Sequence, residues 1–261
     1  MPTMPAVSFS PETAAALSRT TAFFGPEGIA KLRAATVAVF GLGGVGSHAA
    51  CALARNGIGG LRLVDFDTVT SSSLNRHAVA TPADVGRPKV QVMADAIARI
   101  DPSVRIDCRQ AFFAQETRAQ LLEAPLCFVI DAIDSVGPKV ELLSACVAMK
   151  LPVISCLGAA GRIRGESVQL ADIFDSHTCP LARMIRKRLH QSGIRAEIPA
   201  IFSPEVPCAP LPPDESDPYL RRGRRRRQLP SVGVVPGIAG YAAAGYVLRA
   251  IAGWHDEARK R

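Results

Sequence analysis

The chain has 261 residues, of which 48% are hydrophobic and 21% charged, a composition that suits one large α/β domain or two small ones with a buried core. Its 31 Lys and Arg residues outnumber its 23 Asp and Glu residues, and much of the excess is arginine in the C-terminal half, which favours a polyanionic partner such as nucleic acid. The seven cysteines form no C-x-x-C pair, and they are interpreted mainly as reduced core thiols in a cytoplasmic protein.

The order of patterns along the chain indicates four segments. The N-terminus lacks the basic-then-apolar order of a secretory signal, so we expect a leader rather than a targeting segment there. The expected segments are a flexible leader at 1–18, the main domain at 19–203, a Pro- and Arg-rich loop at 204–230, and a C-terminal helix within 231–261 that completes the same domain.

A glycine-rich turn is the first strong pattern. The strand-like residues VAVF at 37–40 run into Gly41, Gly43, Gly44 and Gly46, and a helix is expected over 45–56. Glycines let the backbone turn sharply after a buried strand and bring its N–H groups against a phosphate at the positive end of the helix. The pattern therefore predicts a nucleotide-binding turn.

Strands and helices then alternate along the chain. Strands are expected at 61–66, 104–108, 126–131 and 153–156, and helices at 89–100, 115–122 and 138–149. This alternation predicts an α/β fold, a Rossmann-like, doubly wound, mainly parallel sheet that gathers its ligands at the carboxyl ends of the strands.

The C-terminal part departs from this regular alternation of strands and helices. We expect a bend and an amphipathic strand at 162–173 and a basic helix at 180–193, which together form a C-terminal β/α extension. The uncharged run at 231–248 is long enough to cross a membrane, but it is rich in Gly and Ala and contains Pro236. A buried or interface helix is favoured over membrane association, because small residues at helical spacing also suit close packing.

Charged and amide side chains follow the strands at the edge where the glycine turn lies. They are Asp65, Asp67, Asn75, Arg76, Lys89, Asp131 and Asp134. Asp65 lies about nineteen residues after the last glycine, at the expected position of a ribose-binding acid. A dinucleotide oxidoreductase needs no such charges around the phosphates, whereas two cations with two or three acids suit ATP and Mg²⁺. Asp131 is interpreted as a structural acid.

Three segments carry a family resemblance: GLGGVGSHAACALARNGIGGLRLVDFDTVTSSSLNRH, GRPKVQVMADAIARIDP and VIDAIDSVGPK. They resemble the ATP-adenylating superfamily of ThiF, MoeB, HesA and the ubiquitin-activating enzymes over about residues 19–203. Within it, RTTAFFGPEGIAKL, and CPLARMIRKRLHQSG followed by IFSPE, are most similar to the tRNA threonylcarbamoyladenosine dehydratases. MoeB and ThiF usually carry zinc knuckles in this half, and the chain has none.

The resemblance implies a role for each residue of the predicted ATP site. The four glycines would line ATP, Asp65 would hold the ribose hydroxyls with Asp67 nearby, and Asp134 would bind Mg²⁺. Arg76 and Lys89 would clamp the triphosphate, so that Arg76, Lys89 and Asp134 are the expected catalytic residues.

Two positions depart from the family pattern. Ser73 stands where the superfamily usually has an asparagine, a contact that Asn75 can take over. Ala22 stands where an arginine often reaches the ATP of the neighbouring subunit, and Arg19 is the candidate substitute.

Two basic segments are candidates for binding RNA phosphates. The predicted nucleic-acid residues are Arg183, Arg186, Lys187 and Arg188 in the basic helix, and Arg221, Arg222, Arg224, Arg225, Arg226 and Arg227 in the loop. Such contacts give affinity without sequence choice and weaken with salt. For the run at 221–227, a solvated tail is an equally good interpretation.

The resemblance implies ATP-dependent dehydration of threonylcarbamoyladenosine in tRNA, a cyclisation through an acyl-adenylate. The ring closure is intramolecular, so no nucleophilic thiol is needed. The alternatives are an adenylyltransferase that activates a ubiquitin-like sulfur carrier, a non-catalytic nucleotide-binding adaptor and, more distantly, an NAD-dependent oxidoreductase. The implied partners are a tRNA substrate, a sulfur-relay protein and a second copy of the chain.

Overall fold

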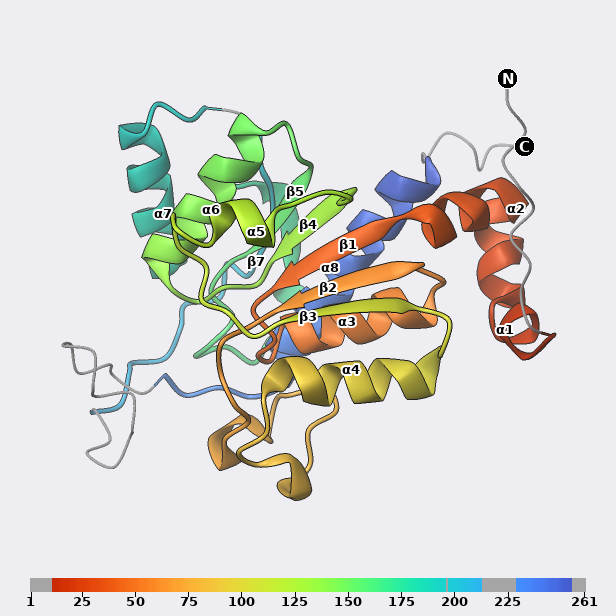
Figure 1. The fold of residues 1–261 in the computed structure, drawn as a ribbon. Coiled ribbons are helices and arrows are strands. Elements are labelled where there is room, and N and C mark those ends of the chain that lie inside the picture. The colour runs from red at the N-terminus through yellow and green to blue at the C-terminus, as the bar shows by residue number, and fades with distance from the viewer. Residues whose placement is uncertain (1–10, 196, 213–228, 255–261) are drawn as a thin grey trace.

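A seven-stranded sheet forms the centre of the computed structural model, which describes residues 11–195, 197–212 and 229–254 (Figure 1). The strand order is β3-β2-β1-β4-β5-β7-β6, and only β6 runs antiparallel to its neighbour. The strands are β1 Thr36–Phe40, β2 Gly60–Val64, β3 Arg105–Arg109, β4 Phe128–Asp131, β5 Val153–Cys156, β6 Gln169–Asp172 and β7 Pro199–Phe202. The predicted doubly wound, mainly parallel sheet with a C-terminal extension is confirmed.

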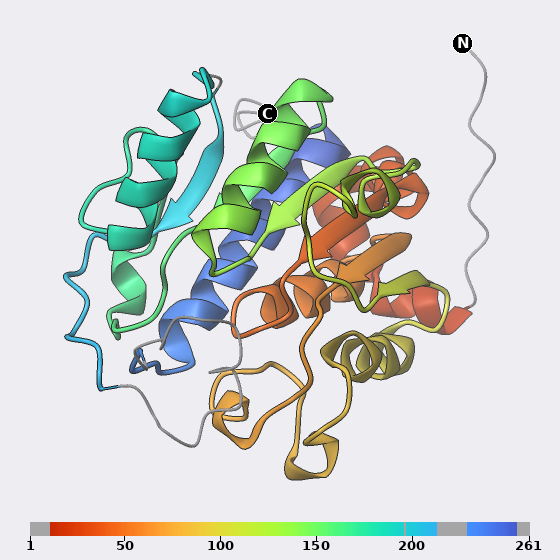
Figure 2. The ribbon, with the colours of Figure 1, turned by 60° about the vertical axis from the view of Figure 1, so that its left-hand side comes forward.

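Helices cover both faces of the sheet. One face packs against α3 Gly46–Arg55, α4 Lys89–Ile100 and α8 Val234–Ala252, and the other against α5 Arg118–Leu121, α6 Val136–Ala148 and α7 Pro180–Gln191 (Figure 2). Two separate clusters of buried hydrophobic side chains lie between these layers. The chain reverses its order across the sheet between β1 and β4, which is where such folds bind their ligands.

The uncharged run near the C-terminus forms α8, which packs against α3. An added Cβ at Gly240 would lie 2.4 Å from the carbonyl oxygen of Val45, and one at Gly237 would lie 3.5 Å from the His48 ring. Among the described helices, α8 alone is long and apolar enough to cross a membrane by length and composition, and half of that stretch is buried within the protein. Its small residues therefore serve close packing, as expected for a buried helix.

The N-terminal boundary differs from the prediction. Residues 11–16, expected to be part of a flexible leader, form the short helix α1 Pro11–Ala16, and α2 Ser18–Ala34 follows and ends before β1. Pro11 in the first turn and the acidic Glu12 both favour a helix start, which explains the difference. Residues 1–10 and the arginine run at 221–227 lie outside the described residues.

Candidate functional site

The glycine turn after β1 is closed tightly against its neighbours. Gly41 has a φ of +85°, and a Cβ added there would lie 2.7 Å from the carbonyl oxygen of Ala132, in the turn after β4. A Cβ added to Gly46 would lie 1.8 Å from the carbonyl oxygen of Gly41. Gly43 is different, because an added Cβ there would meet nothing within 4 Å. Glycine is required at Gly41 and Gly46, while the surface over Gly43 is open for a ligand.

Backbone donors of this turn remain available. The N–H of Leu42 donates to Asp65 Oδ2 at 2.6 Å, but the N–H groups of Gly43 and Gly44 donate to no acceptor in the described part of the chain. The helix α3 starts at Gly46 with no side-chain cap. Free N–H groups at the start of a helix form an anion site, so the turn suits a phosphate.

The side chain of Asp65, which follows β2, links the end of β2 to the turn after β1. Its Oδ2 accepts from Leu42 and its Oδ1 accepts from the N–H of Asp67 at 2.8 Å. The side chain is buried, which raises its pKa, and the positive charge of Lys89 opposes this rise. A carboxylate keeps further lone pairs beyond these two bonds, so Asp65 can still accept from ribose hydroxyls.

Lys89 starts α4 and points back to the same edge. Its Nζ lies 3.0 Å from Asp67 Oδ2 and 4.0 Å from Asp65 Oδ2. The structure thus brings together the glycine turn, both acids and the predicted phosphate-binding lysine. The ammonium group is neutralised by these carboxylates, which holds it at the site.

Arg76 lies beside the glycine turn. Its Cγ would be 3.1 Å from a Cβ on Gly44, and its Nη1 donates to the carbonyl oxygen of Ser72 at 2.6 Å. Burial lowers its pKa, while the charge of Asp134 raises it, so this carboxylate lies within electrostatic reach of the guanidinium. The residue predicted to meet the triphosphate and the residue predicted to meet the metal therefore interact electrostatically.

The amide of Asn75 holds Arg76 in place. Its Oδ1 accepts from Arg76 Nη1 at 3.1 Å and its Nδ2 donates to the carbonyl oxygen of Ser231 at 2.8 Å. Asn75 therefore links the arginine to the segment that enters α8, and a direct contact with ATP stays a prediction. Ser73 forms a capping box with Thr70, so its hydroxyl is already hydrogen-bonded and cannot replace the amide of an asparagine.

Asp134 is an exposed carboxylate in the turn between β4 and α6. Its Oδ1 accepts from Ser135 Oγ at 3.2 Å. Within residues 11–195, 197–212 and 229–254, no three His, Cys, Asp or Glu side chains are grouped as metal ligands. Mg²⁺ in nucleotide sites is usually held by one or two carboxylates together with substrate phosphates, so Asp134 fits a magnesium ion that arrives with ATP.

Lys139, a buried residue beside the site, is absent from the sequence predictions. Lys139 and Asp131 are fully buried and paired at 2.7 Å, which confirms the structural role expected of Asp131. The signal for Lys139 was a lysine in the first turns of an otherwise apolar helix, VGPKVELLSACVA. Two histidines, His48 and His77, also lie beside the site.

Two backbone hydrogen bonds fix the tautomer of the neutral His77 ring. Its Nδ1 accepts from the N–H groups of Val79 and Ala80, at 3.3 and 3.1 Å, so the neutral ring carries its proton on Nε2. Burial is the main cause that lowers the pKa of His77 to about 4, and the charge of Lys89 lowers it further. His48 Nε2 lies 3.2 Å from the carbonyl oxygen of Arg76, within hydrogen-bond distance. Burial lowers the pKa of His48 as well.

The basic helix α7 lies away from the glycine turn, on the β7 side of the sheet (Figure 2). Ile185 and Leu189 are buried, while Arg183, Lys187 and Arg188 are exposed. Arg186 is half-buried and donates to Ser176 Oγ at 2.7 Å. Three of the four predicted RNA-binding residues of this helix are therefore free to meet a phosphate backbone.

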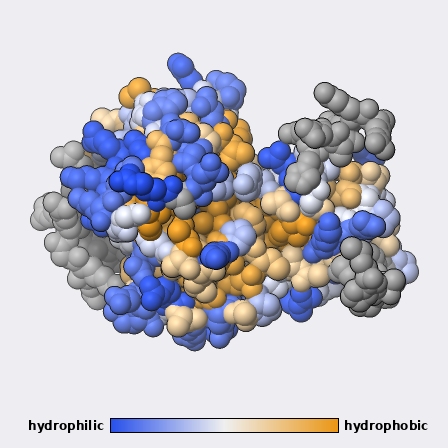
Figure 3. Space-filling view, turned by 90° about the horizontal axis from the view of Figure 1, so that it is seen from above, coloured by the Kyte–Doolittle hydropathy of each residue, from blue (hydrophilic) through white to orange (hydrophobic). Residues whose placement is uncertain are grey.

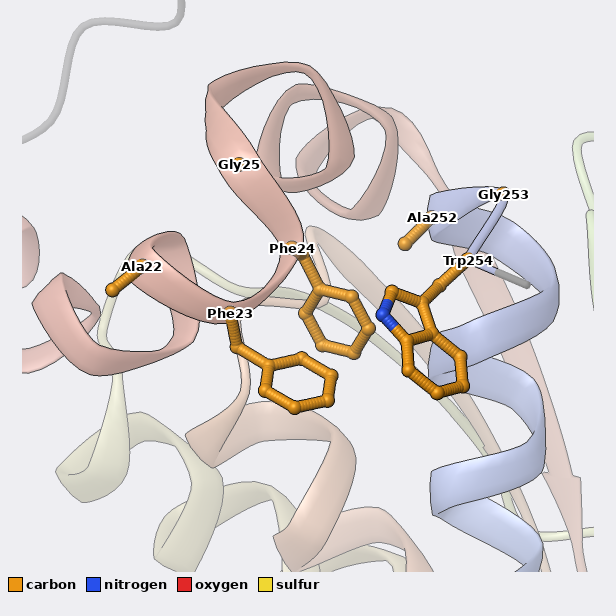
Figure 4. A pocket seen from close by; sticks show the side chains of 7 residues that line it. All are labelled: Ala22, Phe23, Phe24, Gly25, Ala252, Gly253 and Trp254. Atoms are coloured by element: carbon orange, nitrogen blue, oxygen red, sulfur yellow. The ribbon is translucent and has the colours of Figure 1, made fainter. Parts of the chain in front are cut away.

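Two cavities of about 490 and 510 Å³ lie at the far end of α8, where it meets α2. Figure 4 shows that the first is lined by Phe23, Phe24 and Trp254, and Phe23 stacks on Trp254 with ring centroids 5.6 Å apart. Arg19 lines the second cavity, whereas the start of α8 lies by the glycine turn. Arg19 therefore cannot reach the ATP site of its own chain.

Comparisons with known proteins agree with this geometry. The model of the ThiF family matches residues 17–261. A tRNA threonylcarbamoyladenosine dehydratase of Bacillus subtilis is 37% identical over 234 residues, which cover 88% of this chain and 92% of the relative. The crystal structure of the E. coli tRNA N6-threonylcarbamoyladenosine dehydratase TcdA in complex with ATP superposes with a TM-score of 0.84 at 30% identity, covering 98% of this chain and 100% of that chain.

A molybdopterin-synthase adenylyltransferase of Salmonella typhimurium is 41% identical over 106 residues, but these cover only 41% of this chain and 41% of that protein. The similarity to the dehydratases therefore extends over most of the chain, whereas this similarity is confined to a part of it.

The state of His77 predicts a pH dependence of stability. Its folded pKa of about 4 lies below the unfolded value of 6.5, so between these pH values the unfolded chain binds a proton that the folded chain does not. Stability should therefore fall as the pH falls through this window, by about 3 kcal/mol in total. Urea unfolding at pH 7 and pH 4.5 measures it.

His77→Gln should lose less stability over this range than the unsubstituted chain, because it removes the proton uptake. His177→Gln, at an exposed histidine, is the matched control and should leave the dependence unchanged. Equal pH slopes for His77→Gln and His177→Gln would contradict the assignment.

Proposed function

The chain belongs to the ThiF family, and from this premise we propose that it dehydrates threonylcarbamoyladenosine in tRNA at the expense of ATP. The observation that carries the proposal is the convergence of Asp65, Arg76, Lys89 and Asp134 on one open glycine turn, in a chain that matches a dehydratase over nearly its full length. ATP binding is supported by the ATP complex of the E. coli relative.

The electrostatics of the site support a requirement for Mg²⁺. The carboxylates of Asp65, Asp67 and Asp134 outnumber the cations of Arg76 and Lys89, so the five groups sum to one negative charge when all are ionised. A polyanionic triphosphate would be repelled without a further cation. We propose that Asp134 holds Mg²⁺ together with the phosphates, where the ion supplies charge neutralisation.

The chemistry follows from these positions. The glycine turn and Asp65 orient ATP, and a carboxylate oxygen of the modified adenosine attacks the α-phosphorus, forming a P–O bond as the bond to pyrophosphate breaks. Arg76 and Lys89 stabilise the negative charge that builds on the phosphate oxygens. A nitrogen or oxygen of the same substituent then attacks the acyl carbon and expels AMP, which carries away the carboxylate oxygen. The proton from the attacking atom completes the loss of one water.

The attack is intramolecular, so the nucleophile needs no activation by a thiol. Burial raises the pKa of Cys146 and of Cys156 to about 12, so neither thiol near the site is poised to form a thioester. The seven free cysteines, all within the described residues, fit a reducing, cytoplasmic location, where the proposed tRNA substrate would also be found.

ATP–pyrophosphate exchange tests this function. Exchange should appear with tRNA that bears threonylcarbamoyladenosine and stay at background with a sulfur-carrier protein or with no acceptor. Lys89→Ala and Asp134→Ala should each lose about 100-fold or more, as expected when charge stabilisation at the phosphates is removed. Lys31→Ala, at an exposed lysine of α2, is the matched control and should remain active.

Exchange with the sulfur carrier alone would favour the adenylyltransferase, and no exchange with any acceptor would favour an adaptor. A fully active Lys89→Ala variant would overturn the assignment of the site. A sulfur-relay partner of the enzyme stays a prediction.

We propose that the exposed side of α7 contacts the tRNA backbone. Its Arg183, Lys187 and Arg188 are exposed, and within the described residues their side chains form no hydrogen bond or ion pair that a phosphate contact would have to replace. Removing all three charges should weaken tRNA binding and reduce the slope of log affinity against log salt concentration by roughly two to three. Filter binding at several salt concentrations measures this slope.

A triple alanine variant at Arg55, Arg99 and Arg105, exposed arginines on other elements, is the matched control. If the α7 variant keeps the wild-type salt slope, the helix is a solvated face and not an RNA contact. The arginines at 221–227 lie outside the described residues, and their role stays a prediction.

We propose that the chain forms a homodimer through the α2 and α8 surface. Figure 3 shows a hollow lined by hydrophobic residues between the lobe of α5–α7 and the lobe of α1–α2. The two cavities share Phe23 and Phe24, and Phe23 is 48% exposed. Contiguous exposed aromatic surface of this kind usually marks a protein interface.

Phe23→Asp should convert the dimer to a monomer, because a charge would replace an apolar anchor at the centre of the surface. Light scattering after gel filtration reads the mass directly. Phe112→Asp, at another exposed phenylalanine, is the control. A wild-type protein that stays monomeric at micromolar concentration would contradict the proposal.

A further inference from the structure

A buried ion pair lies directly beneath the proposed ATP site. Lys139 Nζ and Asp131 Oδ2 are 2.7 Å apart, and both side chains are completely inaccessible to solvent. Withdrawing two charges from water costs several kcal/mol for each ion, and their attraction seldom returns more than that. Such a pair therefore contributes little to net stability, and its role must be sought in what it holds in place.

The pair fixes the end of β4. Asp131 Oδ1 accepts from the N–H of Ile133 at 3.1 Å, and its Oδ2 accepts from Ser155 Oγ at 2.8 Å on the neighbouring strand β5. Lys139 Nζ also donates to the carbonyl oxygen of Asp131 at 3.4 Å. One carboxylate thus joins β5, the first turns of α6 and the backbone two residues further along.

The segment it holds is the turn 132–134, which touches both halves of the site. The N–H of Ala132 donates to the carbonyl oxygen of Phe40 at 2.8 Å. The carbonyl oxygen of Ala132 lies so close to Gly41 that a Cβ added there would be only 2.7 Å away. Asp134 follows at the exposed end of the turn, within electrostatic reach of Arg76. A shift of this turn would therefore move the glycine turn and the proposed metal-binding carboxylate relative to each other.

We propose that Lys139 is a positioning residue for nucleotide turnover. Through Asp131 it holds the turn 132–134 in one conformation, so that Asp134 keeps its place relative to the glycine turn. Lys139 does not touch the nucleotide, since it is fully buried. The inference rests on the proposed function for its catalytic consequence, but the fixed turn itself can be measured without any turnover.

Lys139→Met tests the inference, because it keeps the length of the side chain and removes the charge. Leu143→Ala is the matched control, since Leu143 is fully buried in the same helix and its truncation leaves a cavity without removing a charge. Hydrogen exchange of the amides at 131–134 and nucleotide binding, with Mg²⁺ and in EDTA, are compared at matched global stability.

In Lys139→Met, the amide of Ile133 should exchange at least 10-fold faster than in Leu143→Ala. The Mg²⁺ concentration for half-maximal ATP binding should rise by about 10-fold, at the low end of the effect of losing a direct partner of a metal ligand, because Lys139 acts on Asp134 only through Asp131 and the turn. ATP binding in EDTA should change much less. If both variants behave alike in exchange and in Mg²⁺ dependence, Lys139 has only a structural role and the inference fails.

The double variant Asp131→Asn with Lys139→Met covers the case in which the single variant does not fold, because it removes the uncompensated buried charge. It should regain stability and still show the fast exchange at Ile133, and slow exchange there would overturn the inference. If the wild type shows no pyrophosphate exchange with any acceptor, the proposed function fails, whereas the amide and binding measurements still decide the role of Lys139.

Discussion

The close approach of the backbone at Gly41 to the carbonyl oxygen of Ala132 is the constraint on which the site depends. It brings the turns after β1 and β4 into contact at the point where the strand order reverses. The bond from Leu42 to Asp65 adds the turn after β2 to the same assembly. Three strand ends are thereby locked around a row of free backbone N–H groups, and no side chain larger than hydrogen is tolerated at the point of contact.

The charges of the site are arranged on this scaffold. Lys89 is balanced by two carboxylates, and Arg76 is held between Ser72 and the amide of Asn75. Both cations are therefore positioned before any ligand arrives, which avoids part of the ordering cost of binding. Because acids outnumber bases among these groups, the proposed Mg²⁺ ion would supply the positive charge that an anionic nucleotide needs there.

The sequence predicts this part of the fold well because its signals are local. The glycine spacing, the acid after the second strand and the lysine at the start of α4 each follow from a few neighbouring residues, and the structure brings them together. Contacts between segments far apart in the chain leave no comparable pattern in the sequence. The bond from Asn75 to Ser231 joins residues 156 positions apart, and a lysine in the first turns of a helix gives no sign that it is buried against Asp131. The helix at Pro11–Ala16 was missed because so short an element has too few residues to show a period.

We propose that the geometry of the site serves loss of water from a tRNA carboxylate and not transfer of an activated carboxylate to another molecule. Mass spectrometry of nucleosides from tRNA incubated with the protein, ATP and Mg²⁺ tests it most directly, with AMP measured in the same reaction. We expect the modified adenosine to lose the mass of one water and one AMP to form for each nucleoside converted. Unchanged nucleoside mass, with AMP formed only when a carrier protein is added, would contradict it.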